Sequence, residues 1–160
     1  MARRESPLYY ADYLQLNKLL ESQLPETSKQ GLPAHDEMLF IIVHQVYELW
    51  FKQILHELDS VIDIFKQEYV DERNIGIAVH RLGRITEIQK LLIDQLHVLE
   101  TMTPLDFLEF RDVLYPASGF QSYQFRIVEN KLGMVPDQRL LYNKEAYSAS
   151  LSCPHQEIVA

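Results

Sequence analysis

The sequence predicts an all-α protein organised around two long antiparallel helices. Residues 35–69 contain neither glycine nor proline, and residues 71–99 contain no proline. Both stretches repeat apolar side chains at three- and four-residue steps, the spacing of one helix face, and neither shows the alternation of a β-strand. The chain has 160 residues, enough for one domain with a hydrophobic core. We expect a single helical domain (1–160) with an N-terminal arm (1–34), a helical core (35–133) and a poorly defined tail (134–160).

The composition excludes several classes of protein. The net charge of -8 disfavours nucleic acid and anionic membranes as partners. The single cysteine, Cys153, rules out an internal disulfide framework and fits a reducing compartment. No apolar run approaches the roughly 20 residues that span a bilayer, and residues 1–5 lack the apolar core of a signal peptide. We therefore expect a cytoplasmic protein.

The arm begins with a segment, Tyr9–Leu20, that reads as one short amphipathic helix. A polar tail precedes it, so its apolar side must pack on a distant part of the chain or on another subunit. Tyrosines suit half-buried interfaces because the ring is apolar and its tip is polar, but packing on the chain's own core is an equal alternative. Residues 23–34 contain two prolines and a glycine and are predicted to form a loop.

The first long helix, predicted over residues 35–69, carries two apolar stripes. Asp36 and Glu37 place negative charge at the positive end of its dipole. The first stripe is expected in the core and comprises Leu39, Ile42, Val46, Leu49, Ile54, Leu58, Val61, Ile62 and Phe65. The second stripe comprises Phe40, His44, Tyr47, Phe51 and Leu55. A helix that is apolar on most of its circumference is buried on both sides or lines a cavity on one of them.

His44 supplies the one imidazole in the second stripe. A buried imidazole needs a hydrogen-bond partner, because leaving a buried polar group unpaired costs about 1–3 kcal/mol. Two readings remain open at this point. His44 is either a core histidine that a neighbouring group satisfies, or a histidine that points into a pocket.

The second long helix, predicted over residues 71–99, forms an antiparallel hairpin with the first. Thr103 and Asp106 then form an approximate capping box, with Pro104 at the first helical position. This shorter helix breaks at residues 115–119, and helix resumes over 120–130 and stops near Gly133. No element is predicted after residue 136, where Pro154 would interrupt any helix running from Cys153 to the end.

Arg111 lies at helical spacing from Phe107, Phe110 and Leu114, so its guanidinium is expected to be partly desolvated. Such a group needs a carboxylate partner. The carboxylate belongs either to this chain or to a ligand gripped by the bidentate fork. The internal candidates are Glu48, Asp106 and Asp112. Ser118 and Gly119 offer a hydroxyl and a bare backbone for close approach, although a plain turn is the commoner meaning.

Other arrangements of reactive side chains are not recognisable. A di-iron carboxylate bundle needs Glu-x-x-His on two helices, and zinc needs three or four converging ligands. The sequence also contains no glycine-rich phosphate loop and no nucleophile elbow.

With these residues in view, the sequence resembles the tryptophan 2,3-dioxygenase family of haem enzymes. The resemblance rests on HDEMLFIIVHQVYELWFKQILHELDS (35–60) and LETMTPLDFLEFRDVLYPASGFQS (99–122), with weaker support from YADYLQL (10–16) and QFRIVENKLG (124–133). It implies an all-helical, haem-dioxygenase-like bundle that assembles as a homotetramer. It also implies haem b as cofactor, and L-tryptophan and dioxygen as substrates.

The resemblance implies roles for individual residues. His44 would be the distal histidine that accepts the indole N–H. Arg111 would clamp the substrate carboxylate, and Phe107 would pack on the indole. The segment lining the indole pocket would be Phe40, Ile41, Ile42, Val43 and His44.

Two further groups of residues follow from the same resemblance. Ser118 and Gly119 would lie beside the haem and the ammonium side of the substrate. Tyr10, Tyr13 and Leu14 would reach into the pocket of a neighbouring subunit, which supports the interface reading of the arm.

One departure from the family concerns the iron. The family's proximal haem ligand is a histidine well downstream of the matching segments, and we do not expect His155 to be that ligand. The sequence therefore predicts an incomplete bundle, an N-terminal portion with no iron ligand before Ala160, which is inactive alone. The alternative is a non-catalytic helical assembly module that retains the family's fold.

Overall fold

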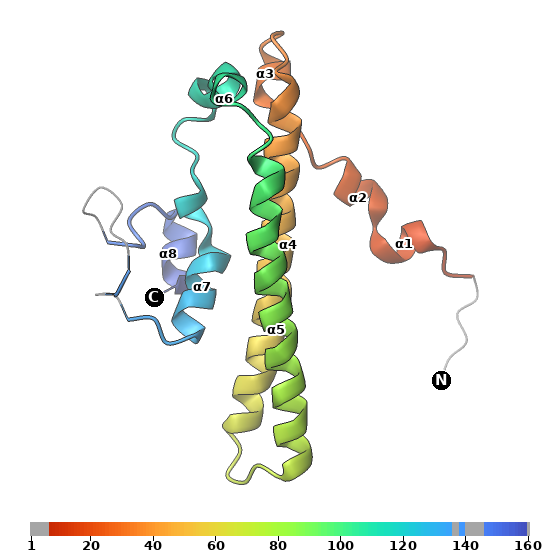
Figure 1. The fold of residues 1–160 in the computed structure, drawn as a ribbon, viewed down its shortest axis with the longest axis vertical. Coiled ribbons are helices and arrows are strands. Elements are labelled where there is room, and N and C mark those ends of the chain that lie inside the picture. The colour runs from red at the N-terminus through yellow and green to blue at the C-terminus, as the bar shows by residue number, and fades with distance from the viewer. Residues whose placement is uncertain (1–6, 136–137, 140–145, 160) are drawn as a thin grey trace.

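The computed structural model describes residues 7–135, 138–139 and 146–159 (Figure 1). Within these residues every regular element is a helix, as the sequence predicts. The helices α4 (His35–Phe65) and α5 (Glu72–Leu99) run antiparallel as a central column, joined by the connection at its lower end in Figure 1. Helices α7 (Tyr123–Lys131) and α8 (Cys153–Val159) lie on one side of this column. Helices α1 (Tyr10–Leu14) and α2 (Leu16–Leu20) extend from the other side.

The core lies between α4, α5 and α7. Its main cluster of buried side chains comprises Ile54, Leu58, Ile85, Ile88, Leu92 and Val128. A second cluster towards the connection comprises Val61, Ile64 and Ala78. The Tyr47 hydroxyl donates to the Leu92 carbonyl oxygen at 2.6 Å and so ties α4 to the upper half of α5. Asp71 caps α5 by accepting from the Asn74 backbone N–H at 2.7 Å.

Helix α6 (Pro104–Arg111) begins with the predicted capping box. The Asp106 backbone N–H donates to the Thr103 hydroxyl at 3.3 Å, and the Thr103 N–H donates to the Asp106 carboxylate at 2.9 Å. The short 3₁₀ helices η1 (Asp112–Leu114) and η2 (Gly119–Gln121) follow before α7. The Gln124 side chain fastens α7 to α4 by donating to the Glu48 carboxylate at 2.7 Å.

The arm is not the single helix that its sequence predicts. It breaks at Gln15, whose φ of 53° is left-handed and ends α1 after five residues. Neither α1 nor α2 contains a buried residue, and Tyr10 and Tyr13 are 73% and 70% exposed. Helices α1 and α2 therefore contribute no buried residue to the core of the described chain.

Two short helices lie where none is predicted. Helix α3 (Glu26–Lys29) falls in the segment read as a loop. Helix α8 begins at Cys153, so Pro154 occupies its first turn, where a backbone N–H has no partner within the helix. Proline therefore does not interrupt α8, and the prediction that it would do so is wrong.

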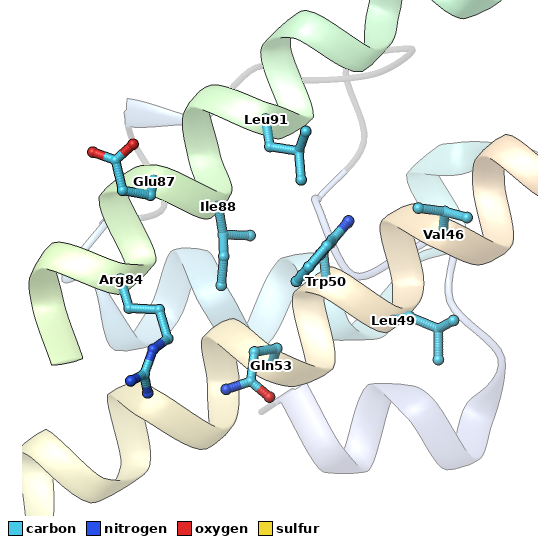
Figure 2. A pocket seen from close by; sticks show the side chains of 8 residues that line it. All are labelled: Val46, Leu49, Trp50, Gln53, Arg84, Glu87, Ile88 and Leu91. Atoms are coloured by element: carbon cyan, nitrogen blue, oxygen red, sulfur yellow. The ribbon is translucent and has the colours of Figure 1, made fainter. Parts of the chain in front are cut away.

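The predicted core stripe of α4 is only partly buried. Ile54, Leu58 and Val61 are buried, but Ile42 and Leu49 are 43% and 49% exposed, and α4 ends at Phe65 instead of near residue 69. Figure 2 shows the groove of about 680 Å³ that this leaves between α4 and α5. It is lined by Val46, Leu49, Trp50, Gln53, Arg84, Glu87, Ile88 and Leu91. None of the described helices combines the length and the apolar character needed to cross a membrane.

Candidate functional site

His44 lies on α4 and is half-buried. Its Nδ1 atom is 2.7 Å from the Phe40 carbonyl oxygen, one turn earlier in the same helix. A carbonyl oxygen only accepts hydrogen bonds, so Nδ1 carries the proton, and in the neutral imidazole Nε2 is then an acceptor. Each of the two readings of His44 is therefore partly right. The helix satisfies one ring nitrogen, and the other remains available.

His44 lines a cavity of about 290 Å³ between α4, the end of α5 and the start of α7. This volume is near the lower end of the range for small-molecule sites, about 300–1,000 Å³. The lining residues are Val43, His44, Tyr47, Glu48, Phe51, Leu96, Leu99, Gly119, Ser122 and Phe125. Most of these side chains are apolar, and burial raises the pKa of Tyr47, whose proton is already given to Leu92. The cavity suits an apolar ligand with a small number of polar contacts.

A cluster of aromatic rings adjoins His44. The Phe40 ring centroid lies 4.1 Å from that of His44, 5.8 Å from Phe107 and 5.4 Å from Phe110. The rings of Phe107 and Phe110 meet edge to face, with centroids 5.4 Å apart. Phe110 is 0% exposed, so it anchors α6 against α4. The capping box and this anchor together fix the position of α6.

Arg111 follows Phe110 at the end of α6 and is half-buried. Its guanidinium carbon lies 5.8 Å from the Phe107 ring centroid, within reach of a cation–π contact. The internal ion pairs weighed for Arg111 are not formed: Glu48 binds Gln124, and Asp106 binds Thr103. Among the described residues, no carboxylate oxygen lies within 4.0 Å of the Arg111 guanidinium. Its fork is free to bind a ligand.

The remaining predicted residues divide between this region and the rest of the molecule. Ser118 caps η2 by accepting from the Phe120 N–H at 3.3 Å, and Gly119 lines the cavity of His44. A side chain at position 119 would meet no atom within 4 Å, so the backbone there is open to close approach.

Within the pocket-lining segment, Val43 is buried and lines the cavity, Phe40 and Ile41 are half-buried, and Ile42 is exposed. Tyr10, Tyr13 and Leu14 lie on α1, on the opposite side of the central column from α7 (Figure 1). The chain therefore brings His44 and Gly119 to one cavity. Phe40 packs on His44, Phe107 packs on Phe40 and Arg111 lies over Phe107, while the tyrosines of the arm lie apart.

Sequence reasoning missed two polar residues near His44. Glu48 and Ser122 both line the cavity, and Gln124 connects to Glu48 from 76 residues away. The sequence does not predict Glu48 as a lining residue of the cavity. Its spacing of four residues from His44 was the available signal. The pairing of Glu48 with Gln124 left no signal in the sequence, because no local pattern indicates a contact between helices that are distant in the chain.

The residues that the structure describes contain no group of three or more histidine, cysteine, aspartate and glutamate side chains that could hold a metal ion. His155 lies on α8, where its ring stacks on Tyr123 with centroids 4.3 Å apart.

Comparison with known proteins agrees with these observations. The sequence model of the family described as tryptophan 2,3-dioxygenase matches residues 2–159. The chain is 62% identical over 146 residues to tryptophan 2,3-dioxygenase of Bdellovibrio bacteriovorus, covering 91% of this chain and 41% of the relative. It is 59% identical over 140 residues to the Dictyostelium discoideum protein of that name, covering 88% and 35%. For the Anopheles gambiae protein the identity is 51% over 150 residues, covering 94% and 38%. The chain thus spans well under half the length of these relatives.

Proposed function

Because this chain belongs to the tryptophan 2,3-dioxygenase family, we propose that it forms the substrate-facing part of a haem-dependent dioxygenase. The enzyme opens the indole ring of L-tryptophan and yields N-formyl-L-kynurenine. The observation that carries this proposal is the state of His44. Its Nδ1 proton is held by Phe40, so that Nε2 is an acceptor in a cavity with apolar walls.

The indole is bound by complementarity with this cavity. An indole is a flat apolar body with a single N–H donor, so it requires aromatic walls and one acceptor. The cavity itself supplies apolar walls at Val43, Phe51 and Phe125. In the proposal the indole also packs on Phe40 and Phe107, the rings next to His44, and the Nε2 atom of His44 accepts the indole N–H. His44 orients the ring and does not have to abstract its proton. Ile41, Ile42 and Val43 complete the segment that faces the substrate.

The amino-acid end of the substrate is bound by Arg111. Its guanidinium has no carboxylate partner among the described residues and holds the substrate carboxylate by two parallel hydrogen bonds. A site that engages both ends separates L-tryptophan from bare indole, because the shorter ligand leaves the half-buried charge of Arg111 unpaired.

The residues present fit one face of a haem. Gly119 gives open backbone at an apolar wall, and Ser118 precedes it, so these two residues would lie beside the porphyrin. When bound, haem supplies the activation of dioxygen for addition across the indole C2–C3 bond. The iron ligand is assigned to a part of the full-length family chain outside these residues, and the chain alone is inactive.

The proposed enzyme is a homotetramer in which the arm serves a neighbouring subunit. Tyr10, Tyr13 and Leu14 reach the neighbour's pocket, in keeping with their exposure in the isolated chain. Rings with a polar tip are suited to such a half-buried site.

A chimaera tests the proposal directly. In it, this chain replaces the matching N-terminal part of the Bdellovibrio bacteriovorus relative, whose remaining sequence follows. We expect the chimaera to form N-formyl-L-kynurenine from L-tryptophan, measured by the product's absorbance. The change Arg111→Met should raise KM for L-tryptophan by about 100-fold, because two charge-assisted hydrogen bonds are lost.

The change His44→Ala should weaken tryptophan binding or turnover by at least about tenfold, as expected for a lost buried hydrogen bond. His56→Ala is the matched control, because His56 is an exposed histidine of the same helix. Full turnover in the His44→Ala chimaera would contradict the proposal and favour the non-catalytic module.

A further experiment on the chain alone tests whether these residues supply a histidine ligand to the haem iron. A haem titration followed at the Soret band should give no histidine-ligated spectrum. A tight five- or six-coordinate histidine spectrum would place the ligand within these residues and overturn this part of the proposal.

A further inference from the structure

A second cavity, of about 400 Å³, lies along the segment that follows Ser118. Its lining residues are Ser118, Gly119, Phe120, Phe125, Arg126, Glu129, Met134, Gln138 and Arg139. Gly119 and Phe125 also line the cavity of His44, so the two cavities share these two residues. The second cavity combines aromatic and apolar walls with two guanidinium groups.

Both guanidinium groups are buried, with Arg126 6% and Arg139 8% exposed. They share one carboxylate: Arg126 Nη1 lies 2.9 Å and Arg139 Nη1 3.3 Å from the same Glu129 oxygen, Oε2. Arg139 also donates to the Met134 carbonyl oxygen at 2.9 Å and to the Asn130 side chain. Among the residues that the structure describes, two buried cations therefore face one anion, which leaves an excess of one positive charge.

The hydrogen-bonding capacity of the pair is also incomplete. The Nε atoms of Arg126 and Arg139 are buried and have no hydrogen-bond partner in the described part of the chain. The guanidinium carbons lie near aromatic rings, 5.7 Å from the Phe125 centroid for Arg126 and 3.8 Å from that of Tyr147 for Arg139. Ring contact favours a cation but does not satisfy these N–H donors, and an unmade hydrogen bond of a buried charged group is costly.

We propose that this cavity binds a carboxylate, which Arg126 and Arg139 hold. A single negative charge balances the excess, and a planar carboxylate matches the planar guanidinium fork. The apolar walls at Phe120, Phe125 and Met134 suit a ligand whose carboxylate is attached to an apolar body. The carboxylate belongs either to a bound haem or to a free apolar carboxylic acid. The first of these sources rests on the function proposed above.

The test compares ligands that differ only in the carboxylate. Unaltered chain is titrated with haem, with haem dimethyl ester and with phenylacetate, and calorimetry measures the heat of binding of each. If haem is the source, haem binds at least about tenfold more tightly than its ester. If a free acid is the source, phenylacetate binds, while haem and its ester do not differ.

Variants of the two arginines then test whether they cause the preference for a free carboxylate. Arg126→Met and Arg139→Met should each remove the preference for the free carboxylate, whereas Arg73→Met, at an exposed arginine of α5, should keep it. Circular dichroism shows whether each variant is folded. If unaltered chain neither distinguishes haem from its ester nor binds phenylacetate, the proposal is overturned, and this result needs no variant. The phenylacetate titration contains no haem or tryptophan, so its outcome is independent of the chimaera's activity.

Discussion

At the scale of single residues, α4 buries two carboxylates in different ways. Glu37 is 0% exposed and forms no ion pair with any residue that the structure describes. It accepts from the backbone N–H groups of Glu26 at 2.6 Å and Thr27 at 3.0 Å, and from the Thr27 hydroxyl. Glu57 is also buried but binds Arg84 Nη1 at 2.5 Å, with Arg81 Nε at 4.0 Å. The first carboxylate organises a short helix, and the second joins two long ones.

Replacing Glu37 with glutamine tests the first role. The amide keeps one acceptor oxygen but turns an NH₂ group towards N–H donors, so α3 loses part of its support. We expect Glu37→Gln to lower the free energy of unfolding by about 1–3 kcal/mol, measured by denaturant titration. Glu68→Gln, at an exposed position after α4, is the control and should change it by less than about 0.5 kcal/mol. Equal stability of the two variants would mean that α3 does not depend on Glu37.

The second role has a pH signature. Burial acts to raise the pKa of Glu57, but the hydrogen bond and charge of Arg84 outweigh it, so this pKa lies below its usual value. A carboxyl with a lowered folded-state pKa contributes its stability fully above the unfolded-state pKa. The contribution is lost as the pH falls through the lower folded-state value.

We therefore expect Arg84→Met to lower the free energy of unfolding at neutral pH and to matter progressively less in acid. The loss should be about 1–2 kcal/mol, modest because the Arg84 side chain is 47% exposed. Denaturant titrations across the acid range measure it, with Arg73→Met as the control. A loss that stays constant down to the lowest pH would show that the ion pair is not its cause.

The sequence indicated which residue types matter at the site, but not their partners. The spacing of His44 within an apolar stripe correctly marked it as a group that needs a hydrogen bond. Its partner, the Phe40 carbonyl, belongs to the helix backbone, which every residue possesses and no pattern distinguishes. The pairing of Arg126 with Arg139 through Glu129 was missed for a related reason, since it forms between α7 and a segment without periodicity.

At the scale of elements, the caps fix where helices begin. Thr103→Ala removes the side-chain acceptor at the start of α6, and we expect a loss of about 1 kcal/mol in the free energy of unfolding. Thr103→Ser retains a hydroxyl and should retain most of this stability. Thermal and denaturant unfolding compare the two variants. If alanine and serine are equally tolerated, the capping box does not determine the stability of α6.

Long elements were predictable from the sequence, and short ones were not. Periodicity over many turns predicted α4 and α5, and capping chemistry predicted α6. Helix α3 has four residues and depends on Glu37, ten residues further along, so no local signal could report it. The break at Gln15 was also hidden, because glutamine has no special preference for the left-handed conformation.

At the scale of the whole molecule, the central column leaves apolar surface exposed. Val79 and Ile93, on α5, are 64% and 66% exposed, and the groove of Figure 2 adds Leu49. Periodicity identified these side chains as members of apolar faces. It could not tell which face would find a partner within these residues, because burial depends on what packs against the helix. Exposed apolar patches of this kind mark surfaces for association.

The exposed faces predict a difference between the chain alone and the chimaera. The chain alone should bind the dye 8-anilinonaphthalene-1-sulfonate strongly, and the chimaera should bind it several-fold less, because the remaining part of the family chain covers these faces. Fluorescence emission of the dye measures both. The double change Val79→Gln with Ile93→Gln should lower dye emission from the chain alone, whereas Gln89→Ala, at an exposed polar site of α5, should not. Equal emission from chain and chimaera would contradict this prediction.

The hydrogen bond between His44 and Phe40 has a consequence for design. Both partners belong to one turn of α4. The orientation of the imidazole is therefore fixed by the backbone of its own helix, and no second helix is needed to hold it. A graft of residues 40–44 into an unrelated stable helix would carry a histidine of fixed tautomer with it.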